Sequence, residues 1–187
     1  MFEDELFEKI DFAILPIKKG DYENCTFLNC DFSNADLSGF NFSDSTFKNC
    51  NLSLAKLSKT ALREVYFIGC KLLGLHFDNC DKLLFAVRFE DCSLNMSSFF
   101  RLNLKKTTFK NTTLQEVDFT ETDLSAAIFD NCDLSMATFD NTILEKADLR
   151  TAFNYIISPE KNRIRKAKFS LAGIRGILDG FDIVVEG

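Results

Sequence analysis

The amino-acid sequence predicts an all-β solenoid, a rod in which short extended segments wind into stacked four-sided coils. Two observations indicate this fold. The segment TFLNCDFS at 26–33 returns as TFKNCNLS at 46–53 and IFDNCDLS at 128–135, through steps of 20 residues and one step of 22. Within each step a large apolar residue recurs every five residues. That spacing matches neither the period of a helix nor that of a strand, so we expect a turn after every pentapeptide.

Each pentapeptide carries one large and one small inward residue. The large residues form 26 consecutive centres from Tyr22 to Leu149, and a smaller residue such as Cys25 or Ala35 stands two positions before its centre. Positions two apart on an extended segment point the same way. Asn, which tolerates left-handed backbone, suits the corner two residues after the centre. It occupies that position at Asn24, Asn29, Asn34, Asn49, Asn79, Asn111, Asn131 and Asn141.

Centres that are 20 residues apart form four nearly pure columns, as expected if like side chains stack on like. The first column reads Phe27, Phe47, Phe67, Phe89, Phe109, Phe129 and Leu149. The fourth reads Tyr22, Phe42, Leu62, Leu84, Leu104, Leu124 and Leu144, provided that two extra residues lie between Phe77 and Leu84. The small residues of the second column form a predicted thiol ladder: Cys30, Cys50, Cys70, Cys92, Thr112 and Cys132.

The pattern divides the chain into three parts. Residues 1–21 hold Phe7, Phe12 and Ile17 in phase and form an N-terminal cap or an incomplete first coil. Residues 22–150 form the repeat, with a small outward bulge at 78–84 around Lys82. Residues 151–187 contain an excursion, a last coil and a C-terminal helix and strand.

This C-terminal part is expected to cover the open end of the last coil. The excursion contains Pro159, and the motif resumes at Ala167 and Phe169. Ser170 is then a candidate N-cap for a short helix that ends at Gly180. The sequence places Leu171, Ile174 and Leu178 on one helical face and Phe181, Ile183 and Val185 in a strand.

The sequence shows no motif for catalysis, a cofactor or a metal. The seven Cys mostly occupy small inward positions, which favours buried reduced thiols over disulfides or metal ligands. His76 precedes Phe77 and should point outward. There is no Gly-rich phosphate loop, HExxH or GxSxG. The absence of these motifs predicts a non-enzymatic protein. No run approaches the roughly 18 apolar residues of a membrane span, so we also expect a soluble, cytoplasmic protein without membrane contact.

The outward charge is strongly acidic over residues 111–149. This segment contains nine acidic residues and one basic residue, Lys146, so its net charge is −8. The resulting linear charge density is like that of duplex DNA. These candidate binding residues are Glu116, Asp118, Glu121, Asp123, Asp130, Asp133, Asp140, Glu145 and Asp148. The five bases of KNRIRKAK at 161–168 instead indicate a solvated outer face.

The stretches NADLSG, DLSAA, CDLSMA and KADLR resemble the A(D/N)LXX consensus of the pentapeptide-repeat family, over about residues 22–149. The resemblance implies a right-handed quadrilateral β-helix. It also leaves a second interpretation of Asp123, Asp133 and Asp148, because the consensus places Asp or Asn before the central Leu for structural reasons.

The tail is similar to the C-terminal helix and strand of Qnr-type quinolone-resistance members, which form two-fold dimers. That resemblance implies a homodimer through Leu171, Ile174, Ile177, Leu178 and Phe181; the alternative is a cap that buries its own end. It also implies a protein partner, DNA gyrase or topoisomerase IV, whose DNA saddle the acidic rod would occupy as a DNA mimic. No direct nucleic-acid binding is expected.

Two observations keep another function open. Many Qnr-type proteins project longer loops, whereas the sequence here indicates only the bulge near Lys82. A structural or scaffolding solenoid would instead bind another protein through an apolar or mixed patch. The stretch SFFRLNL at 98–104 is a candidate for that patch, because Phe100 follows the inward Phe99 and should be exposed.

Overall fold

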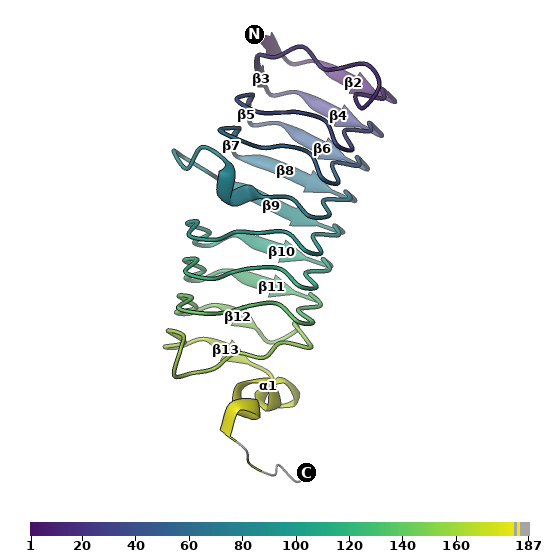
Figure 1. Ribbon diagram of the computed structural model, residues 1–187. Helices are drawn as coiled ribbons and strands as arrows, with labels where there is room; N and C mark the ends of the chain where they lie inside the picture. Colours follow the sequence, from purple (N-terminus) through teal and green to yellow (C-terminus); the bar gives the residue numbers. More distant parts are fainter. Residues whose placement is uncertain (182, 184–187) are drawn as a thin grey trace.

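The computed structural model describes residues 1–181 and 183, and it shows a four-sided parallel β-solenoid of about eight turns (Figure 1). In the described part, a nine-stranded parallel sheet runs along one side of the whole rod, which we call side 1. Its strands are β2 (Leu6–Glu8), β4 (Thr26–Leu28), β6 (Thr46–Lys48), β8 (Val65–Ile68), β9 (Val87–Glu90), β10 (Thr108–Lys110), β11 (Ile128–Asp130), β12 (Asp148–Leu149) and β13 (Lys168–Phe169).

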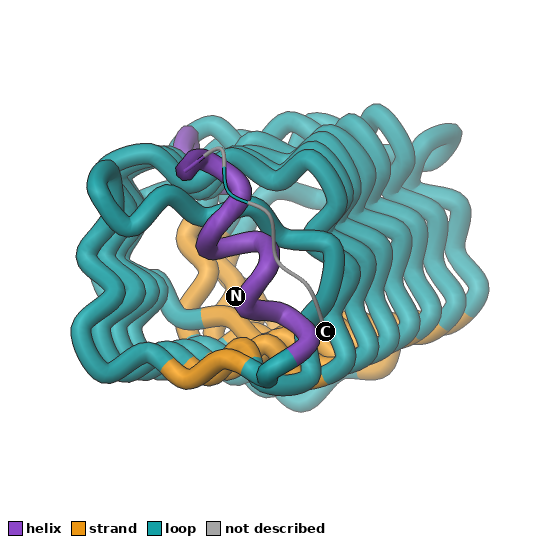
Figure 2. Tube along the Cα trace, turned by 90° about the horizontal axis from the view of Figure 1, so that it is seen from below, coloured by secondary structure: helices purple, strands orange, loops and turns teal. Residues whose placement is uncertain are grey.

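The other three sides follow in chain order and give the coil its quadrilateral cross-section (Figure 2). Sides 2 and 3 are joined by isolated parallel bridges such as Asp31↔Asn51 and Asp118↔Thr138. Side 4 begins as a parallel sheet of four strands among the described residues: β1 (Phe2–Glu3), β3 (Asp21–Glu23), β5 (Asn41–Ser43) and β7 (Ala61–Arg63). The first coil starts at Phe2, whose ring stacks on Tyr22 with centroids 4.7 Å apart.

The stacked columns confirm the predicted fold class. Partners in the sheet are 20 residues apart, as in Phe109↔Phe129, and these two rings stack with centroids 5.0 Å apart. Neighbouring columns meet edge to face, as Phe119 and Phe129 do at 6.0 Å. Both geometries are favourable for aromatic pairs. One inward pattern thus generates a continuous apolar core along the rod.

The small inward residues also link the coils by hydrogen bonds. The Sγ of Cys50 donates to the carbonyl of Phe27 at 3.3 Å, and the Sγ of Cys132 donates to that of Phe109 at 3.3 Å. Thr122 makes the same bond through Oγ1 to Phe99 at 2.7 Å. A buried polar group costs little when it is paired in this way, so Cys, Ser and Thr can alternate at the position.

The corners adopt left-handed backbone, as the sequence predicts. Seven of the eight predicted Asn corners have positive φ, between 48° and 59°. Asn79 is the exception, because it ends the short 3-10 helix Phe77–Asn79. Successive corner amides also bond along the rod, as Asn131 Nδ2 does to Asn111 Oδ1 at 3.0 Å. The corner is therefore part of the stacking and not merely a connection.

The bulge differs in detail from the prediction. Asp81 bridges Ala61, so Lys82 stands at the position of an inward centre, and Leu84 has the φ of +59° typical of a corner. The two extra residues are thus Phe85 and Ala86, after which Val87 pairs with Val65. Leu84 was predicted in the fourth column, which is wrong: it is 72% exposed. The half-buried Phe85 packs against Phe77 in its place.

The excursion around Pro159 adds no residues to the coil. Arg163 bridges Ile143, and β13 pairs with β12, so both segments keep the 20-residue register. Tyr155 and Ile157 are buried, and buried Asn162 donates from Nδ2 to the carbonyl of Phe139 at 3.0 Å. The last coil therefore keeps its register, although the chain takes a different path around Pro159.

A helical cap crosses the open end of the last coil (Figure 2). It consists of the 3-10 helix Ala172–Ile174, helix α1 (Arg175–Leu178) and the 3-10 helix Asp179–Phe181. The predicted capping by Ser170 is confirmed, since its Oγ accepts the Gly173 N–H at 3.0 Å. The helix buries Ile177, whereas Leu171, which is predicted on the same helical face as Ile174 and Leu178, is 91% exposed.

The predicted C-terminal strand is not found in the part that can be compared. Phe181 ends the last 3-10 helix, and Ile183 is exposed outside any strand. Val185 lies outside the described residues. Within the described chain, no helix has the length and apolar character needed to cross a membrane.

Candidate protein-binding surface

The inward side chains are packed together, so the candidate functional groups lie on the outer surface. All seven Cys are buried free thiols. His76 is exposed, as predicted, with Nδ1 3.3 Å from Asp78 Oδ1. Among residues 1–181 and 183, no group of three or more His, Cys, Asp or Glu has the arrangement needed for a metal ion.

The nine predicted acidic residues do not gather on one face. Asp130 and Asp148 lie on side 1 and Asp133 on side 2. Side 3 carries Asp118 and Asp140, with Glu116 and Glu121 at its two corners, and side 4 carries Asp123 and Glu145. All nine are at least partly exposed. The acidic coils thus form a belt around the rod.

Bases, most of them on neighbouring coils, form ion pairs with four of the nine. Arg101 binds both carboxylate oxygens of Glu121, at 2.7 and 2.9 Å. Lys105 lies 3.2 Å from Asp123, and Arg163 lies 2.6 Å from Glu145. Asp148 contacts Arg150 at 2.7 Å and Lys168 at 3.6 Å. A count along the sequence misses these partners, because most are 18 to 20 residues away and only stacking makes them neighbours.

Five carboxylates make no ion pair in the described part of the chain: Glu116, Asp118, Asp130, Asp133 and Asp140. Three of them, Glu116, Asp118 and Asp140, lie on side 3 or at the corner that leads to it. Side 3 of these coils, with its corners, therefore has the greatest excess of negative charge.

The Asp residues before a centre also support the local backbone. Asp118, Asp123 and Asp133 each accept, at Oδ1, the N–H of the residue two positions later, and so does Asp148. Such bonds are typical of Asp in turns. Hydrogen bonds from Arg150 lower the pKa of Asp148 to about 2. Partial burial alone would raise the pKa of Asp123, but hydrogen bonds from Ser125 and Lys105 lower it. These hydrogen bonds support the interpretation that Asp before the central residue has a structural role in the repeat.

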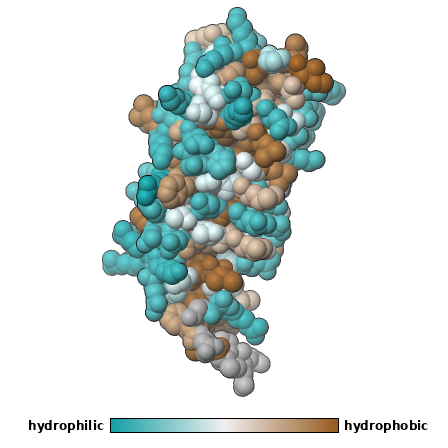
Figure 3. Space-filling view, in the orientation of Figure 1, coloured by the Kyte–Doolittle hydropathy of each residue, from teal (hydrophilic) through white to brown (hydrophobic). Residues whose placement is uncertain are grey.

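The candidate apolar patch around Phe100 is smaller than predicted. Phe100 is half-buried, and the Arg101 guanidinium covers its ring at 4.6 Å from the centroid. On the face seen in Figure 3, exposed hydrophobic side chains form separate patches between hydrophilic ones. The five bases of residues 161–168 are all exposed, as predicted.

The five candidate dimer residues divide into two groups. Ile177 is buried by its own chain, and Ile174 and Leu178 are half-buried. Leu171 and Phe181 are exposed, by 91% and 43%. Only the second group is available to a second copy without rearrangement of the cap.

Two protein-family models match parts of the chain. The family model for a pentapeptide repeat region matches residues 21–82, and the model for pentapeptide repeats in eight copies matches residues 118–153. No curated protein sequence matches the chain.

Several solved structures are similar to the chain. Two are trypsin-treated variants of QnrB1, which is described as a plasmid-mediated fluoroquinolone resistance protein. Each match covers 99% of this chain and 99% of the QnrB1 chain, with a TM-score of 0.66 and a sequence identity of 17% or 18%. A third is HetL of Nostoc sp. strain PCC 7120, a pentapeptide repeat protein involved in the regulation of heterocyst differentiation, with 17% identity, 89% and 86% coverage and a TM-score of 0.43. The stacked pentapeptides and the two family matches together show that the chain belongs to the pentapeptide-repeat family.

Proposed function

We propose that the protein is a non-enzymatic binding protein whose partner is another protein, and that it acts in the cytoplasm. The packed interior supports binding through the outer surface. The seven free thiols support a reducing compartment. The acidic belt of residues 111–149, held on rigid coils, is the observation that carries the proposal.

The partner we propose first is a type II topoisomerase, DNA gyrase or topoisomerase IV. The acidic coils would occupy its DNA-binding saddle as a DNA mimic and so protect it from quinolones. The match to QnrB1 along nearly the whole chain supports this, as do the unpaired acids on and beside side 3. A two-fold dimer through Leu171 and Phe181 would place the acidic coils near the middle of a double rod.

The test is DNA supercoiling by purified gyrase, with and without ciprofloxacin, across a titration of the protein. The informative variant neutralises four acids that make no ion pair with any described residue: Glu116→Gln, Asp118→Asn, Asp130→Asn and Asp140→Asn. Neutralising Glu121 or Asp123 instead would release Arg101 or Lys105 and confuse the result. The control removes four exposed charges from the first coils, none of which forms an ion pair among the described residues: Glu3→Gln, Glu5→Gln, Glu23→Gln and Asp44→Asn.

We expect the wild-type protein either to rescue gyrase from the drug or to inhibit supercoiling. The first variant should lose this effect, and the control should keep it. Acidic side chains at such a surface mainly govern association rate and register, and salt screens their charge, so the effect of the wild-type protein should weaken at high salt and the difference between it and the first variant should shrink. If wild-type protein at micromolar concentration leaves supercoiling unchanged in both conditions, this partner is wrong.

A scaffolding solenoid that binds another protein is the second candidate function. The spread of the acids over four sides and the ion pairing of four of them favour it. Partner capture by a scaffold should survive both high salt and the fourfold neutralised variant, whereas capture by a DNA mimic should survive neither.

A further inference from the structure

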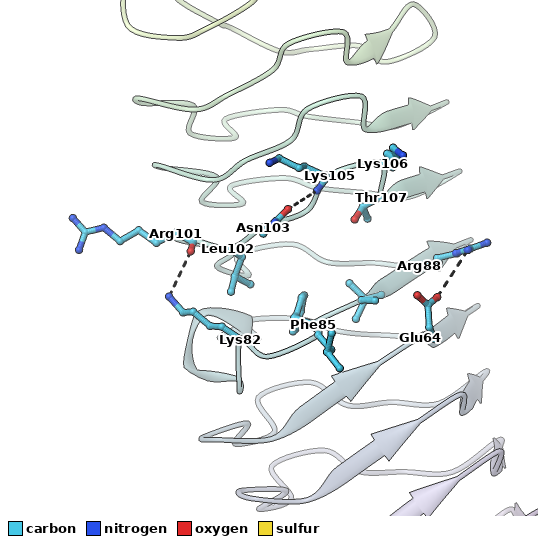
Figure 4. A pocket seen from close by; sticks show the side chains of 13 residues that line it. Glu64, Lys82, Phe85, Arg88, Arg101, Leu102, Asn103, Lys105, Lys106 and Thr107 are labelled. Carbon is cyan, nitrogen blue, oxygen red and sulfur yellow. Dashed lines mark hydrogen bonds and ion pairs between the residues drawn. The ribbon is translucent and has the colours of Figure 1, made fainter.

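A basic hollow of about 550 Å³ opens on side 4 beside the bulge (Figure 4). Phe85, Ala86, Val87 and Leu102 supply its apolar part, and Asn103 and Thr107 line it as well. Five bases surround it: Lys82, Arg88, Arg101, Lys105 and Lys106. Glu64 is the one acid among these lining residues.

The bulge creates this hollow by interrupting the stacking of side 4. Bridges join Ala61 to Asp81 and Asn103 to Asp123, but none joins Asp81 to Asn103 in the described part of the chain. In the coils immediately before and after it on this side, an inward Leu fills the centre position: Leu62 and Leu104. Here Lys82 holds that position and turns to solvent, where its Nζ reaches the carbonyl of Arg101 at 3.5 Å.

The hollow carries positive charge that the protein itself does not fully neutralise. Residues 82–110 contain six bases and two acids, whereas the whole chain has a net charge of −6. Arg101 and Lys105 are held by Glu121 and Asp123, and Arg88 lies 3.9 Å from Glu64. Lys82 and Lys106 contact no carboxylate in residues 1–181 and 183.

An apolar edge adjoins these two free cations. Leu83 and Leu84 are 66% and 72% exposed at the tip of the bulge, and Leu84 and half-buried Phe85 line the hollow. A lysine at a core position, two inserted residues and two exposed leucines all depart from the repeat at one place. Such local departures from a consistent pattern are expected where a surface has a function.

We propose that this hollow binds an extended acidic peptide segment of a partner protein. Carboxylates of the segment lie against Lys82 and Lys106, and an apolar side chain of the segment packs on Leu84 and Phe85. The site adjoins the acidic coils, to which Arg101 and Lys105 are ion-paired, but it is opposite to them in sign, so it takes a different part of a partner than a basic DNA saddle would. A peptide fits better than a free phosphate because it uses both the charges and the apolar edge.

The test uses fluorescence anisotropy of a short, fluorescein-labelled, glutamate-rich peptide with a single phenylalanine. The variant is Lys82→Gln with Lys106→Gln, since both side chains are exposed and neither supports the core. Lys56→Gln with Lys59→Gln is the matched control, because Lys59 is also an exposed corner lysine with left-handed φ. A second variant, Leu84→Asn, keeps a residue that tolerates the left-handed corner and removes the apolar edge.

We expect the first variant to weaken peptide binding about tenfold, since exposed ion pairs contribute modestly and two are lost. The control should change it little, Leu84→Asn should weaken it, and a peptide with glutamine in place of glutamate should not bind. The site is wrong if both lysine pairs have equal effects. The occupant is wrong if duplex DNA or inorganic polyphosphate displaces the peptide at matched charge, or if a lysine-dependent self-association shows that a second copy fills the hollow.

Discussion

Gly176 lies directly against the carbonyl of Tyr155, so that a Cβ at Gly176 would stand 1.9 Å from the Tyr155 carbonyl oxygen. The Ile157 N–H donates to the Gly176 carbonyl at 2.9 Å. Gly173 is equally tight, because a Cβ there would lie 2.0 Å from the Tyr155 hydroxyl oxygen. The cap is therefore seated on the last coil through two glycines, and at Gly176 the opposing atom is backbone, so only Gly fits there.

Gly176→Ala should destabilise the protein, because the added methyl group must push the cap away from a fixed backbone. The expected loss is about 1–3 kcal/mol in the free energy of unfolding, as for other overpacked sites. Urea unfolding followed by circular dichroism measures it. Gly20→Ala is the control, since the nearest atom to its Cβ would be 3.5 Å away. Equal stability of the two variants would contradict the close seating of the cap.

Removal of Phe85 and Ala86 together with Lys82→Leu should restore a regular 20-residue coil. The new Leu would fill the inward centre, and full burial of such a side chain contributes about 1.5–3 kcal/mol. We expect a higher unfolding midpoint in urea and, because the hollow closes, loss of acidic-peptide binding. Lys82→Leu alone is the comparison and should gain less, since Phe85 already occupies part of that space. A destabilised deletion variant would show that the insertion is required for the fold.

The seven thiols should not react with Ellman's reagent in the native protein. All seven are buried, so the reagent cannot reach them in the folded state. Burial also raises the pKa of the Cys132 thiol to about 12, and only a thiolate reacts readily. All seven should react after denaturation in guanidinium. Ile14→Cys provides an accessible reference, because Ile14 is 81% exposed, and should add one fast-reacting thiol to the native count. Fast reaction of the unsubstituted native protein would rule out the packed thiol column.

Stability should fall in acid partly through Asp148. Hydrogen bonds from Arg150 lower its pKa from 3.8 to about 2, so its carboxylate stabilises the folded state above pH 4. That contribution is lost as the pH falls from 4 to 2. Asp148→Asn should therefore reduce stability at pH 7 and flatten the decline between these two values, as measured by urea unfolding across pH. Asp140→Asn, which removes no ion pair seen in the described part of the chain, should keep the wild-type slope.

The repeat makes most of the fold predictable, because position within the pentapeptide decides the direction of each side chain. The bulge shows where this reasoning fails. An apolar residue was preferred for the inward centre, which selected Leu84 over Lys82, whereas backbone stacking kept Lys82 in register and placed Leu84 at a corner. The regular spacing of the corners contains that information, because the corner at Glu64 recurs 20 residues later at Leu84.

The surface is less predictable than the core, because charge compensation acts across coils. Glu121 and Arg101 are 20 residues apart and form a two-point ion pair. A window over residues 111–149 counts the acid and omits its base. The basic hollow was missed for a related reason, since Lys82, Arg88 and Lys106 approach one another only through the interrupted stacking. Counting charges by column and coil would have found both features.

The 20-residue register also sets distances. Each coil advances the rod by one strand spacing, about 4.8 Å, and returns the chain to the same side. Insertion or loss of one whole coil would thus change the separation between the hollow and the cap by a fixed increment and leave each in its own register position on the coil. Proteins of this architecture can therefore differ in the distance between two surface sites by whole coils, while the sites themselves stay the same.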